Sequence, residues 1–309
     1  MKIVVTGAAG LVGQNLIPRL KAVATLKIVA CDKHPTNTVR LRQLHPDLKV
    51  VQADLAEPGP WQAELKDAEC VVIGHAQIGG LGEEEFVRNN ILATQRLLDC
   101  LSYNRSCRLV HISSSVVNSL AVDWYTETKK EQEKLVRDAG HPTVILRPTL
   151  MFGPFDRKHL GWLARFMKKV PLFPVPGTGR YVRQPLYVGD FCSIIEACIK
   201  GKVAEGTFDI SGQERIEYID LMRLVRSSIQ ARTAIVRIPY RLFWLLLRSY
   251  ALIDSNPPFT TKQLEALVTP DEFAIIDWPG IFGVSSTPLA KALEETFRNS
   301  PASSIVLDF

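Results

Sequence analysis

The segment Thr6-Gly7-Ala8-Ala9-Gly10-Leu11-Val12-Gly13 follows a short apolar run and leads into a stretch of helical periodicity. Gly7 would permit a tight turn, Gly10 a close approach of the backbone to a pyrophosphate, and Gly13 close packing of helix against strand. The helix start would offer free N–H groups and the positive end of its dipole to the anion. We therefore expect a dinucleotide phosphate to contact Gly7, Gly10, Leu11, Val12 and Gly13.

Asp32 ends the next apolar run and lies 19 residues after Gly13. A carboxylate at this place can accept hydrogen bonds from both hydroxyls of an adenosine ribose. It would repel a 2′-phosphate, so the sequence predicts NAD as the cofactor. Basic side chains at Lys33 and Arg40 lie close by and keep NADP as the less favoured alternative.

The first two hundred residues alternate apolar runs of strand length with helical patterns. The apolar runs cover residues 2–6, 27–31, 49–53, 70–75, 108–112 and 143–147, and the clearest helical patterns cover residues 90–99 and 129–136. Strands that alternate with helices indicate βαβ units and right-handed crossovers. We predict an α/β fold with a Rossmann-type, doubly wound parallel sheet.

The pattern changes after about residue 150, where proline and glycine become dense at 171–179. Such a composition is typical of a loop between structural units. We expect an NAD-binding domain made of residues 1–150 with about 181–199. A smaller C-terminal substrate lobe would comprise residues 151–180 and 200–309.

Three serines end the apolar run 108–112, and Tyr125 and Lys129 follow four residues apart on a predicted helix. Residues at this spacing share a helix face, so the lysine can lie beside the tyrosine. A neighbouring positive charge favours the phenolate, which could take a proton from an alcohol while hydride moves to the cofactor. We expect Ser115, with Ser114 as the alternate, to align the reacting oxygen.

Together these motifs resemble those of the extended short-chain dehydrogenase/reductase family, in its NAD-dependent epimerase/dehydratase branch. The resemblance implies that Asp54 and Leu55 contact adenine. It also implies that Val71-Val-Ile-Gly-His-Ala76 stands where the family has a strand ending near the nicotinamide ribose. Leu146-Arg-Pro148 and Arg183-Gln-Pro-Leu-Tyr187-Val-Gly-Asp190 are similar to two further signatures, and the arginine of the second often holds a substrate phosphate. The implied cofactor contacts outside the glycine turn are Asp32, Asp54, Leu55, Ala76, Asn90, Ser113, Tyr125, Lys129 and Pro148, and the substrate contacts are Ser114, Ser115 and Arg183.

Two departures from the family pattern leave the substrate open. Tyr125 follows Ser115 by only ten residues, and Gln184 stands where the family has an aspartate. The resemblance implies an epimerase, dehydratase or reductase acting on a sugar linked to a nucleotide or to a lipid diphosphate. A hydroxysteroid- or flavonol-type reductase and a non-catalytic nucleotide-binding subunit are the alternatives.

Composition excludes several other classes of protein. Hydrophobic residues make up 46% of the 309 residues, and the net charge of +5 is mild and without basic blocks, so we expect no nucleic-acid partner. The six cysteines form no CxxC pair, which favours buried reduced thiols over disulfides or metal ligands. No leader segment is recognisable at the start, so we expect a cytoplasmic protein.

One stretch, residues 238–253, is dense in large apolar and aromatic residues and carries two arginines seven apart. It could be a lobe helix buried against the core or against a partner. Alternatively, a basic amphipathic helix can lie in a membrane interface, which would suit a lipid-linked substrate. The family resemblance also implies a homodimer.

Overall fold

A parallel sheet of seven strands forms the centre of the computed structural model, which describes residues 1–80, 82–119, 122–252, 260–269, 273–298 and 305–308. The strands follow the order β11-β6-β5-β4-β1-β2-β3, and every neighbouring pair is parallel. Their bounds are β1 Lys2–Thr6, β2 Lys27–Asp32, β3 Lys49–Gln52, β4 Cys70–Ile73, β5 Arg108–Ile112, β6 Thr143–Pro148 and β11 Gly206–Ile210. The predicted Rossmann-type α/β fold is therefore confirmed.

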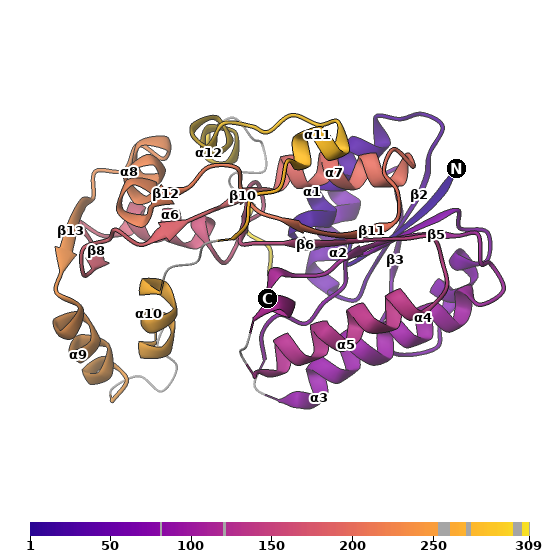
Figure 1. The fold of residues 1–309 in the computed structure, drawn as a ribbon, viewed down its shortest axis with the longest axis horizontal. Helices are drawn as coiled ribbons and strands as arrows, with labels where there is room; N and C mark the ends of the chain where they lie inside the picture. The colour runs from indigo at the N-terminus through magenta and orange to yellow at the C-terminus, as the bar shows by residue number, and fades with distance from the viewer. Residues whose placement is uncertain (81, 120–121, 253–259, 270–272, 299–304, 309) are drawn as a thin grey trace.

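Both faces of this sheet are covered by helices, as continuous apolar strands require. Ile3 and Val5 pack into one hydrophobic cluster, whereas Val4 packs into a second cluster on the opposite face. Figure 1 shows α1 and α7 on one side of the sheet and α4 and α5 on the other. The bounds of the covering elements are α1 Leu11–Lys21, α2 Pro35–Leu44, η1 Pro60–Leu65, α3 Glu83–Phe86, η2 Val87–Leu92, α4 Ala93–Leu101, η3 Ser115–Asn118, α5 Trp124–Asp138 and α7 Val188–Ile199.

A smaller lobe beside the central sheet has its own hydrophobic cluster. This cluster is built largely from three helices, α6 (Leu160–Lys169), α8 (Tyr218–Ser228) and α12 (Leu289–Phe297). Three pairs of short strands, β10 with β7, β12 with β9 and β13 with β8, connect its helices. The bounds are β7 Met151–Phe152, α6 Leu160–Lys169, β8 Leu172–Pro176, β9 Val182–Arg183, β10 Leu186–Tyr187, β12 Ile216–Glu217, α8 Tyr218–Ser228, β13 Ala234–Ile238, α9 Tyr240–Tyr250, α10 Thr261–Val268, α11 Trp278–Phe282 and α12 Leu289–Phe297. Of the predicted 238–253 stretch, residue 253 lies outside the described residues.

The range 200–309, which we expected to form part of the lobe, also supplies the edge of the central sheet. β11 pairs in parallel with β6, and Trp278 and Phe282 of α11 join the hydrophobic cluster beneath α1 and α7. Within 181–199, α7 packs on α1, whereas β9 pairs with β12 in the lobe. We propose a division in which α7, β11 and α11 belong to the nucleotide-binding domain, and α6, α8, α9, α10 and α12 to the lobe.

The six cysteines are free thiols, and burial raises the pKa of those on the strands and on α7. Among the described residues, no helix combines the length and the apolar character that crossing a bilayer requires.

Candidate active site

The glycine turn between β1 and α1 has the shape that a phosphate cradle needs. Gly7 has φ +64°, and a Cβ there would lie 2.5 Å from the carbonyl oxygen of Gly74. A Cβ on Gly13 would lie 2.3 Å from the carbonyl oxygen of Ala8. A Cβ on Gly10 would meet only the Gly7 carbonyl oxygen, at 3.3 Å, so the protein leaves space above this residue. Gly7 and Gly13 thus shape the turn, and Gly10 faces open space.

The start of α1 is free to bind an anion. Its N-cap, Gly10, supplies no capping side chain, and the first turn contains no acidic residue. The N–H group of Gln14 donates to Gly10, whereas no described group accepts from the N–H groups of Leu11, Val12 and Gly13. These residues therefore fit the pyrophosphate of a dinucleotide.

Asp32 links the glycine turn to the end of β2. Its Oδ2 accepts a hydrogen bond from the N–H of Ala9 at 2.9 Å, and its Oδ1 accepts one from the N–H of His34 at 2.9 Å. Each carboxylate oxygen has a second lone pair, so both keep capacity for a ribose hydroxyl. The half-buried carboxylate is thus oriented by the backbone at the place where the sequence predicts the adenosine ribose.

Asp54 and Leu55 are placed by local contacts after β3. The Asp54 carboxylate accepts from the N–H of Ala56 at 2.9 Å and from Arg88 at 3.1 Å, and Leu55 is buried in the hydrophobic cluster beneath α4. Burial would raise the pKa of Asp54, but the hydrogen bonds from Ala56 and Arg88 outweigh it and lower the pKa. Their contact with adenine stays a prediction.

Asn90 holds the loop that follows β4. Its side chain is fully buried, accepts from the N–H of Gln77 at 2.6 Å and donates to the hydroxyl of Thr128 on α5 at 3.0 Å. It also donates to the Gln77 carbonyl at 3.2 Å. The adjacent Ala76 is exposed. Asn90 therefore positions this loop against α5. The contacts of Asn90 and Ala76 with a cofactor stay predictions.

Tyr125 stands in the first turn of α5, next to the end of β5. Asp123 caps the helix by accepting from the N–H of Thr126 at 2.9 Å. Burial raises the pKa of Tyr125, a hydrogen bond with Ser114 opposes this, and the charge of Asp123 adds to the increase. The phenol is consequently protonated at neutral pH. Ser114 is the N-cap of η3 and Ser115 is its first residue, and the predicted role of Ser115 stays a prediction.

Lys129 lies one helical turn after Tyr125 with only 1% of its surface exposed. Its Nζ donates to the carbonyl of Ile112 at 3.0 Å and to Oε1 of Gln132 at 2.6 Å. Burial lowers the pKa of Lys129 to about 7, although the charge of Glu133 acts in the opposite direction. Near neutral pH the ammonium and amine forms are therefore both populated.

A buried chain of hydrogen bonds connects Lys129 to β1. Gln132 donates to the hydroxyl of Thr94 at 2.9 Å, and Thr94 lies 3.0 Å from Nε2 of His75. Nδ1 of His75 lies 2.8 Å from the hydroxyl of Thr6. Burial, and then the charge of Lys129, lower the pKa of His75 to about 3, so the imidazole is neutral. This chain fixes the lysine relative to the strand that carries the glycine turn.

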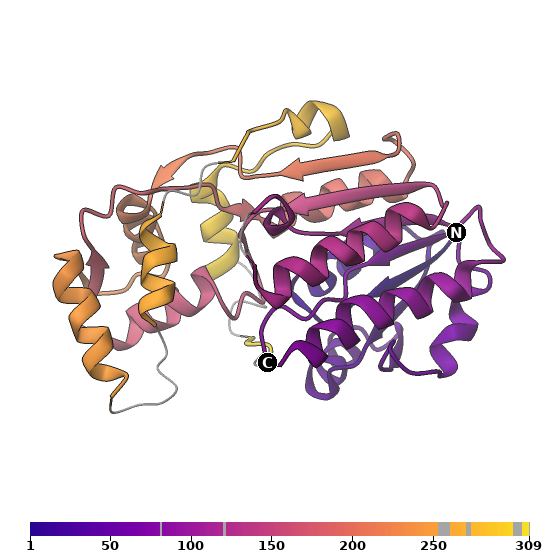
Figure 2. The same cartoon turned by 60° about the horizontal axis from the view of Figure 1, so that its bottom comes forward.

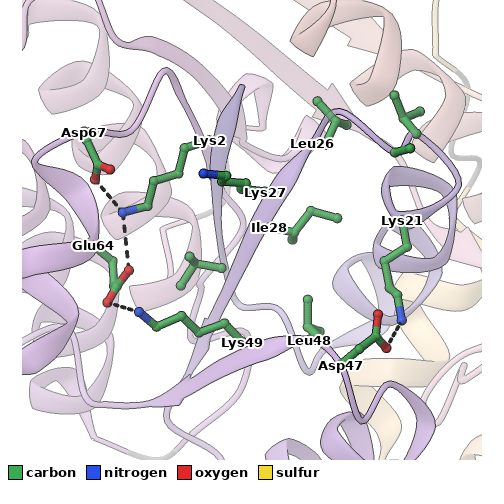
Figure 3. Close-up of a pocket in the computed structure, with 13 residues that line it drawn as sticks. Lys2, Lys21, Leu26, Lys27, Ile28, Asp47, Leu48, Lys49, Glu64 and Asp67 are labelled. Carbon is green, nitrogen blue, oxygen red and sulfur yellow. Dashed lines mark hydrogen bonds and ion pairs between the residues drawn. The ribbon is translucent and has the colours of Figure 1, made fainter.

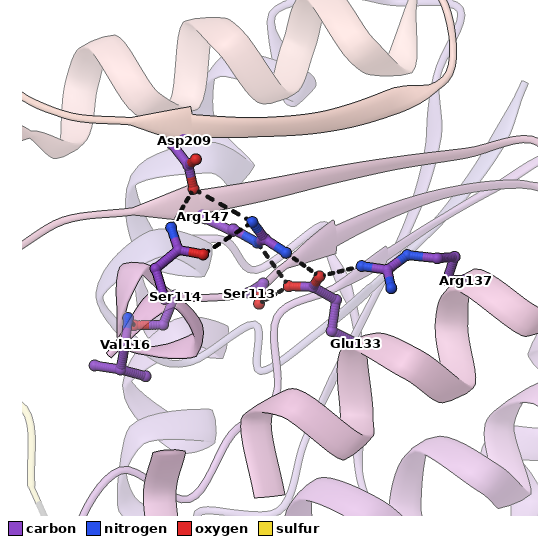
Figure 4. Close-up of polar contacts among 8 residues, drawn as sticks. Ser113, Ser114, Val116, Glu133, Arg137, Arg147 and Asp209 are labelled. Carbon is purple, nitrogen blue, oxygen red and sulfur yellow. Dashed lines mark hydrogen bonds and ion pairs between the residues drawn. The ribbon is translucent and has the colours of Figure 1, made fainter. Parts of the chain in front are cut away.

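Glu133 joins three elements beneath the candidate site, as Figure 4 shows. Ser113 donates to its Oε2 at 2.7 Å, Arg147 donates to its two oxygens at 3.0 and 2.6 Å, and Arg137 contacts it as well. Arg147 also donates to Asn118 of η3 at 3.1 Å. The hydroxyl of Ser113, predicted as a cofactor contact, therefore serves this network. Pro148, another predicted contact, is buried at the end of β6.

Replacing Glu133 by glutamine is expected to lower the free energy of unfolding by about 3 kcal/mol, because two arginines would lose a buried counter-charge. Burial alone would raise the pKa of Glu133, but the hydrogen bonds from Arg147 and Ser113 hold it below 4.5. Urea denaturation at neutral pH measures the loss. Glu131→Gln, an exposed change on the same helix, is the matched control and should have little effect.

The pH dependence gives a second reading of the same change. A carboxyl group whose pKa is lowered by folding stabilises the folded state when the pH is above its ordinary pKa. It loses this contribution as the pH falls through the lowered pKa. The difference between the native chain and Glu133→Gln should therefore shrink below pH 4.5. A difference that stays constant down to acid denaturation would contradict the assignment.

Arg183 is held within the lobe. Its guanidinium donates to the carbonyls of Val182 at 2.7 Å and Thr269 at 3.1 Å, and also to the carbonyl of Leu267. It lies over the ring of Tyr181, 5.2 Å from the centroid. Because two of these carbonyls are at the end of α10, Arg183 holds this helix against β9. Its predicted role as a diphosphate ligand remains a prediction.

A hollow of about 540 Å³ lies at the amino ends of the strands and is separate from the candidate site at their carboxyl ends. It is lined by the first residues of three strands, Lys2, Lys27 and Lys49. Figure 3 shows its ion pairs, in which Glu64 binds Lys2 at 3.3 Å and Lys49 at 2.6 Å. Ligands of doubly wound folds bind at the carboxyl ends of strands, so this hollow does not belong to the cofactor site.

Sequence reasoning missed the residues that support Tyr125 and Lys129. Gln132, Glu133, His75 and Arg147 carry the two networks. One signal was available, because Tyr125, Lys129 and Glu133 are four residues apart and must share one face of α5. The partners on other elements have no such signal.

A Rossmann sheet with a phosphate cradle at one strand end and a Ser-Tyr-Lys group at another defines a class, the NAD-dependent oxidoreductases and epimerases of the short-chain dehydrogenase type. Within this class, the chain belongs to the NAD-dependent epimerase/dehydratase family, whose model matches residues 3–210. The resemblance seen in the sequence is thus confirmed, and the cofactor of the family is NAD.

Three individual proteins show how broad this family is. Ceramide reductase of Caulobacter vibrioides is 25% identical over 303 residues, which is 96% of this chain and 90% of that protein. Subunit 9 of the NADH dehydrogenase [ubiquinone] 1 alpha subcomplex of Rattus norvegicus is 26% identical and covers 95% of this chain and 79% of its own length. The structure of UDP-glucuronic acid 4-epimerase from Bacillus cereus, in complex with UDP-glucuronic acid and NAD, superposes with a TM-score of 0.71 at 22% identity, covering 96% of this chain and 98% of the other.

Proposed function

We propose that this protein transfers hydride between NAD and a secondary alcohol or ketone, with Tyr125 as the general acid/base. Bound NAD supplies the hydride acceptor or donor at C4 of its nicotinamide ring. The observation that carries the proposal is the placement of Tyr125, one helical turn from Lys129 on α5, at the carboxyl ends of the strands that also hold the phosphate cradle.

The protonation states of Tyr125 and Lys129 decide which way a proton can move at the reacting oxygen. Because the pKa of Tyr125 is raised, its phenol can give a proton to a carbonyl oxygen during reduction. Oxidation of an alcohol needs the phenolate, which a charged Lys129 would favour. Ser114 would align the reacting oxygen, with Ser115 as the alternate. Lys129 would also bind the nicotinamide ribose.

The first candidate substrate is a sugar linked to a nucleotide or to a lipid diphosphate, on which the protein would act as epimerase, dehydratase or reductase. This candidate is supported by the family and by the epimerase whose structure holds UDP-glucuronic acid. In that case Arg183 would have to leave the carbonyls of α10 to meet a diphosphate.

A reductase of an apolar ketone, of the hydroxysteroid or flavonol type, is the second candidate. It is favoured by the engaged state of Arg183 and by two apolar residues that precede Tyr125, Val122 at 89% and Trp124 at 47% exposed. Ceramide reductase, similar over 96% of this chain, is named as a reductase of a lipid. A non-catalytic subunit, the third alternative, would need none of the contacts that position Tyr125 and Lys129.

Purified protein should reduce or oxidise substrate with NADH or NAD as followed at the nicotinamide absorbance. UDP- and dTDP-sugars test the first candidate, with NMR of the sugar protons to detect epimers, and a long-chain keto lipid and a ketosteroid test the second. Binding of NAD without turnover of either class would favour the non-catalytic subunit. Absence of NAD binding would overturn the proposal as a whole.

We further propose that the protein acts in the cytoplasm as a homodimer and meets the membrane only peripherally. The dimer and the location rest on the family resemblance and on the sequence. Size-exclusion chromatography with light scattering tests the dimer.

A further inference from the structure

Helix α9, Tyr240–Tyr250, is dense in large apolar residues, yet none of its residues is buried. At roughly 100° per residue, its half-buried positions lie on one side of the helix, namely Tyr240, Phe243, Trp244 and Leu247. The other side carries Leu242, Leu245 and Leu246, which are 49%, 55% and 54% exposed. Large apolar side chains that gather on an exposed face usually mark a contact site, and no residue that the structure describes covers this face.

The segment that contains this face carries a positive net charge. Residues 222–253 contain six arginines and no aspartate or glutamate, namely Arg223, Arg226, Arg232, Arg237, Arg241 and Arg248. Arg241 and Arg248 lie along one edge of the exposed leucine face, and the guanidinium of Arg248 lies 5.2 Å from the ring centroid of Trp244. Arg232 and Arg237 are exposed as well, and none of these four forms an ion pair with a residue that the structure describes.

The neighbouring strands extend the same surface. Val236 on β13 and Leu172 on the paired β8 are exposed, and Lys168 and Lys169 end α6 just before β8. Figures 1 and 2 place α9 at the end of the lobe farthest from the central sheet, with α10 beside it. A partner could therefore cover α9 without closing the carboxyl edge of the sheet where Tyr125 stands.

We infer that α9 and the exposed side of β13 form a docking surface for an anionic lipid bilayer. Leu242, Leu245 and Leu246 enter the boundary between headgroups and acyl chains, and Arg241 and Arg248 meet the lipid phosphates. Leucines beside arginines that form no ion pair with a described residue match the chemistry of such a surface better than that of a second copy, which would bring the same positive charges together. This inference rests on the peripheral membrane contact proposed above, names its surface and its lipid charge, and holds for either class of substrate.

Co-sedimentation of the full chain with vesicles tests the inference. The protein should bind vesicles of phosphatidylcholine mixed with phosphatidylglycerol and should bind phosphatidylcholine alone much more weakly. Leu242→Glu/Leu245→Glu/Leu246→Glu should abolish binding. Arg241→Gln/Arg248→Gln should weaken it by roughly 25-fold, as expected for two basic residues at an anionic surface, and added salt should reduce this difference.

Controls keep the charge and the exposure comparable. Leu44→Glu changes an exposed leucine on α2, and Lys66→Gln/Lys202→Gln removes the same charge at two exposed positions far along the chain from α9. Both variants should bind vesicles as the native chain does. Retained NAD binding shows that each variant is folded.

Absence of binding to anionic vesicles by the native chain would overturn the inference. If the triple leucine variant then also shifts from dimer to monomer, as seen by light scattering, the face belongs to a second copy of this chain.

Discussion

Tyr125→Phe should reduce turnover by about 10³-fold while leaving the affinity for NAD unchanged, because loss of a positioned acid/base costs 10²–10⁴-fold in typical cases. The phenylalanine keeps the ring that fills the site and removes only the hydroxyl that bonds Ser114. Steady-state kinetics with the best substrate, together with NAD titration by fluorescence, separate the two effects.

Tyr103→Phe is the matched control for this change. Tyr103 is 99% exposed, so loss of its hydroxyl should alter neither turnover nor cofactor affinity. Turnover by Tyr125→Phe equal to that of the native chain would show that another group moves the proton.

Lys129→Met should lower turnover by about 10²-fold and should also change how stability depends on pH. The turnover loss follows from removal of the positive charge that favours the phenolate of Tyr125. Methionine has a similar length and fills the buried space, so the change acts on charge more than on packing.

The stability effect has a defined sign. The pKa of Lys129 is about 7 in the folded protein against 10.5 in its ordinary state, so the unfolded chain binds more protons between these values. The free energy of unfolding of the native chain should therefore rise through this window, by up to about 1.4 kcal/mol per pH unit from this group. Lys129→Met should lack this rise, and Lys130→Met, at a half-exposed neighbour, should retain it. Equal slopes in all three proteins would contradict a buried, deprotonating lysine.

The sequence predicted the six strands that come first along the chain, and their ends lie within two residues of those observed. Each of these runs is apolar and continuous, as a strand buried on both faces requires. β11, in contrast, reads Gly-Thr-Phe-Asp-Ile and alternates apolar with polar residues. It was missed because its partner β6 lies more than fifty residues earlier, and no local pattern reveals such a pairing.

For the candidate site, the sequence predicted positions better than contacts. It placed Ser113, Ser114 and Ser115 at a strand end, but which group each serine contacts depends on how the chain turns into η3. Ser114 acts to lower the pKa of Tyr125, whereas Ser113 donates a hydrogen bond to Glu133. Likewise, Asn90 and Arg183 were matched by motif, and only the fold brings Thr128 and the carbonyls of α10 to them.

The position of β11, far along the chain from the other six strands of the central sheet, determines where the chain can be truncated. Ribosomal synthesis completes six strands by residue 148, but the seventh is made only after residue 205. Until then, β6 is an open margin whose backbone groups and apolar side chains invite pairing with other chains. A fragment that ends near residue 150 would keep this strand edge unpaired, so we expect it to aggregate more readily than a chain that includes β11.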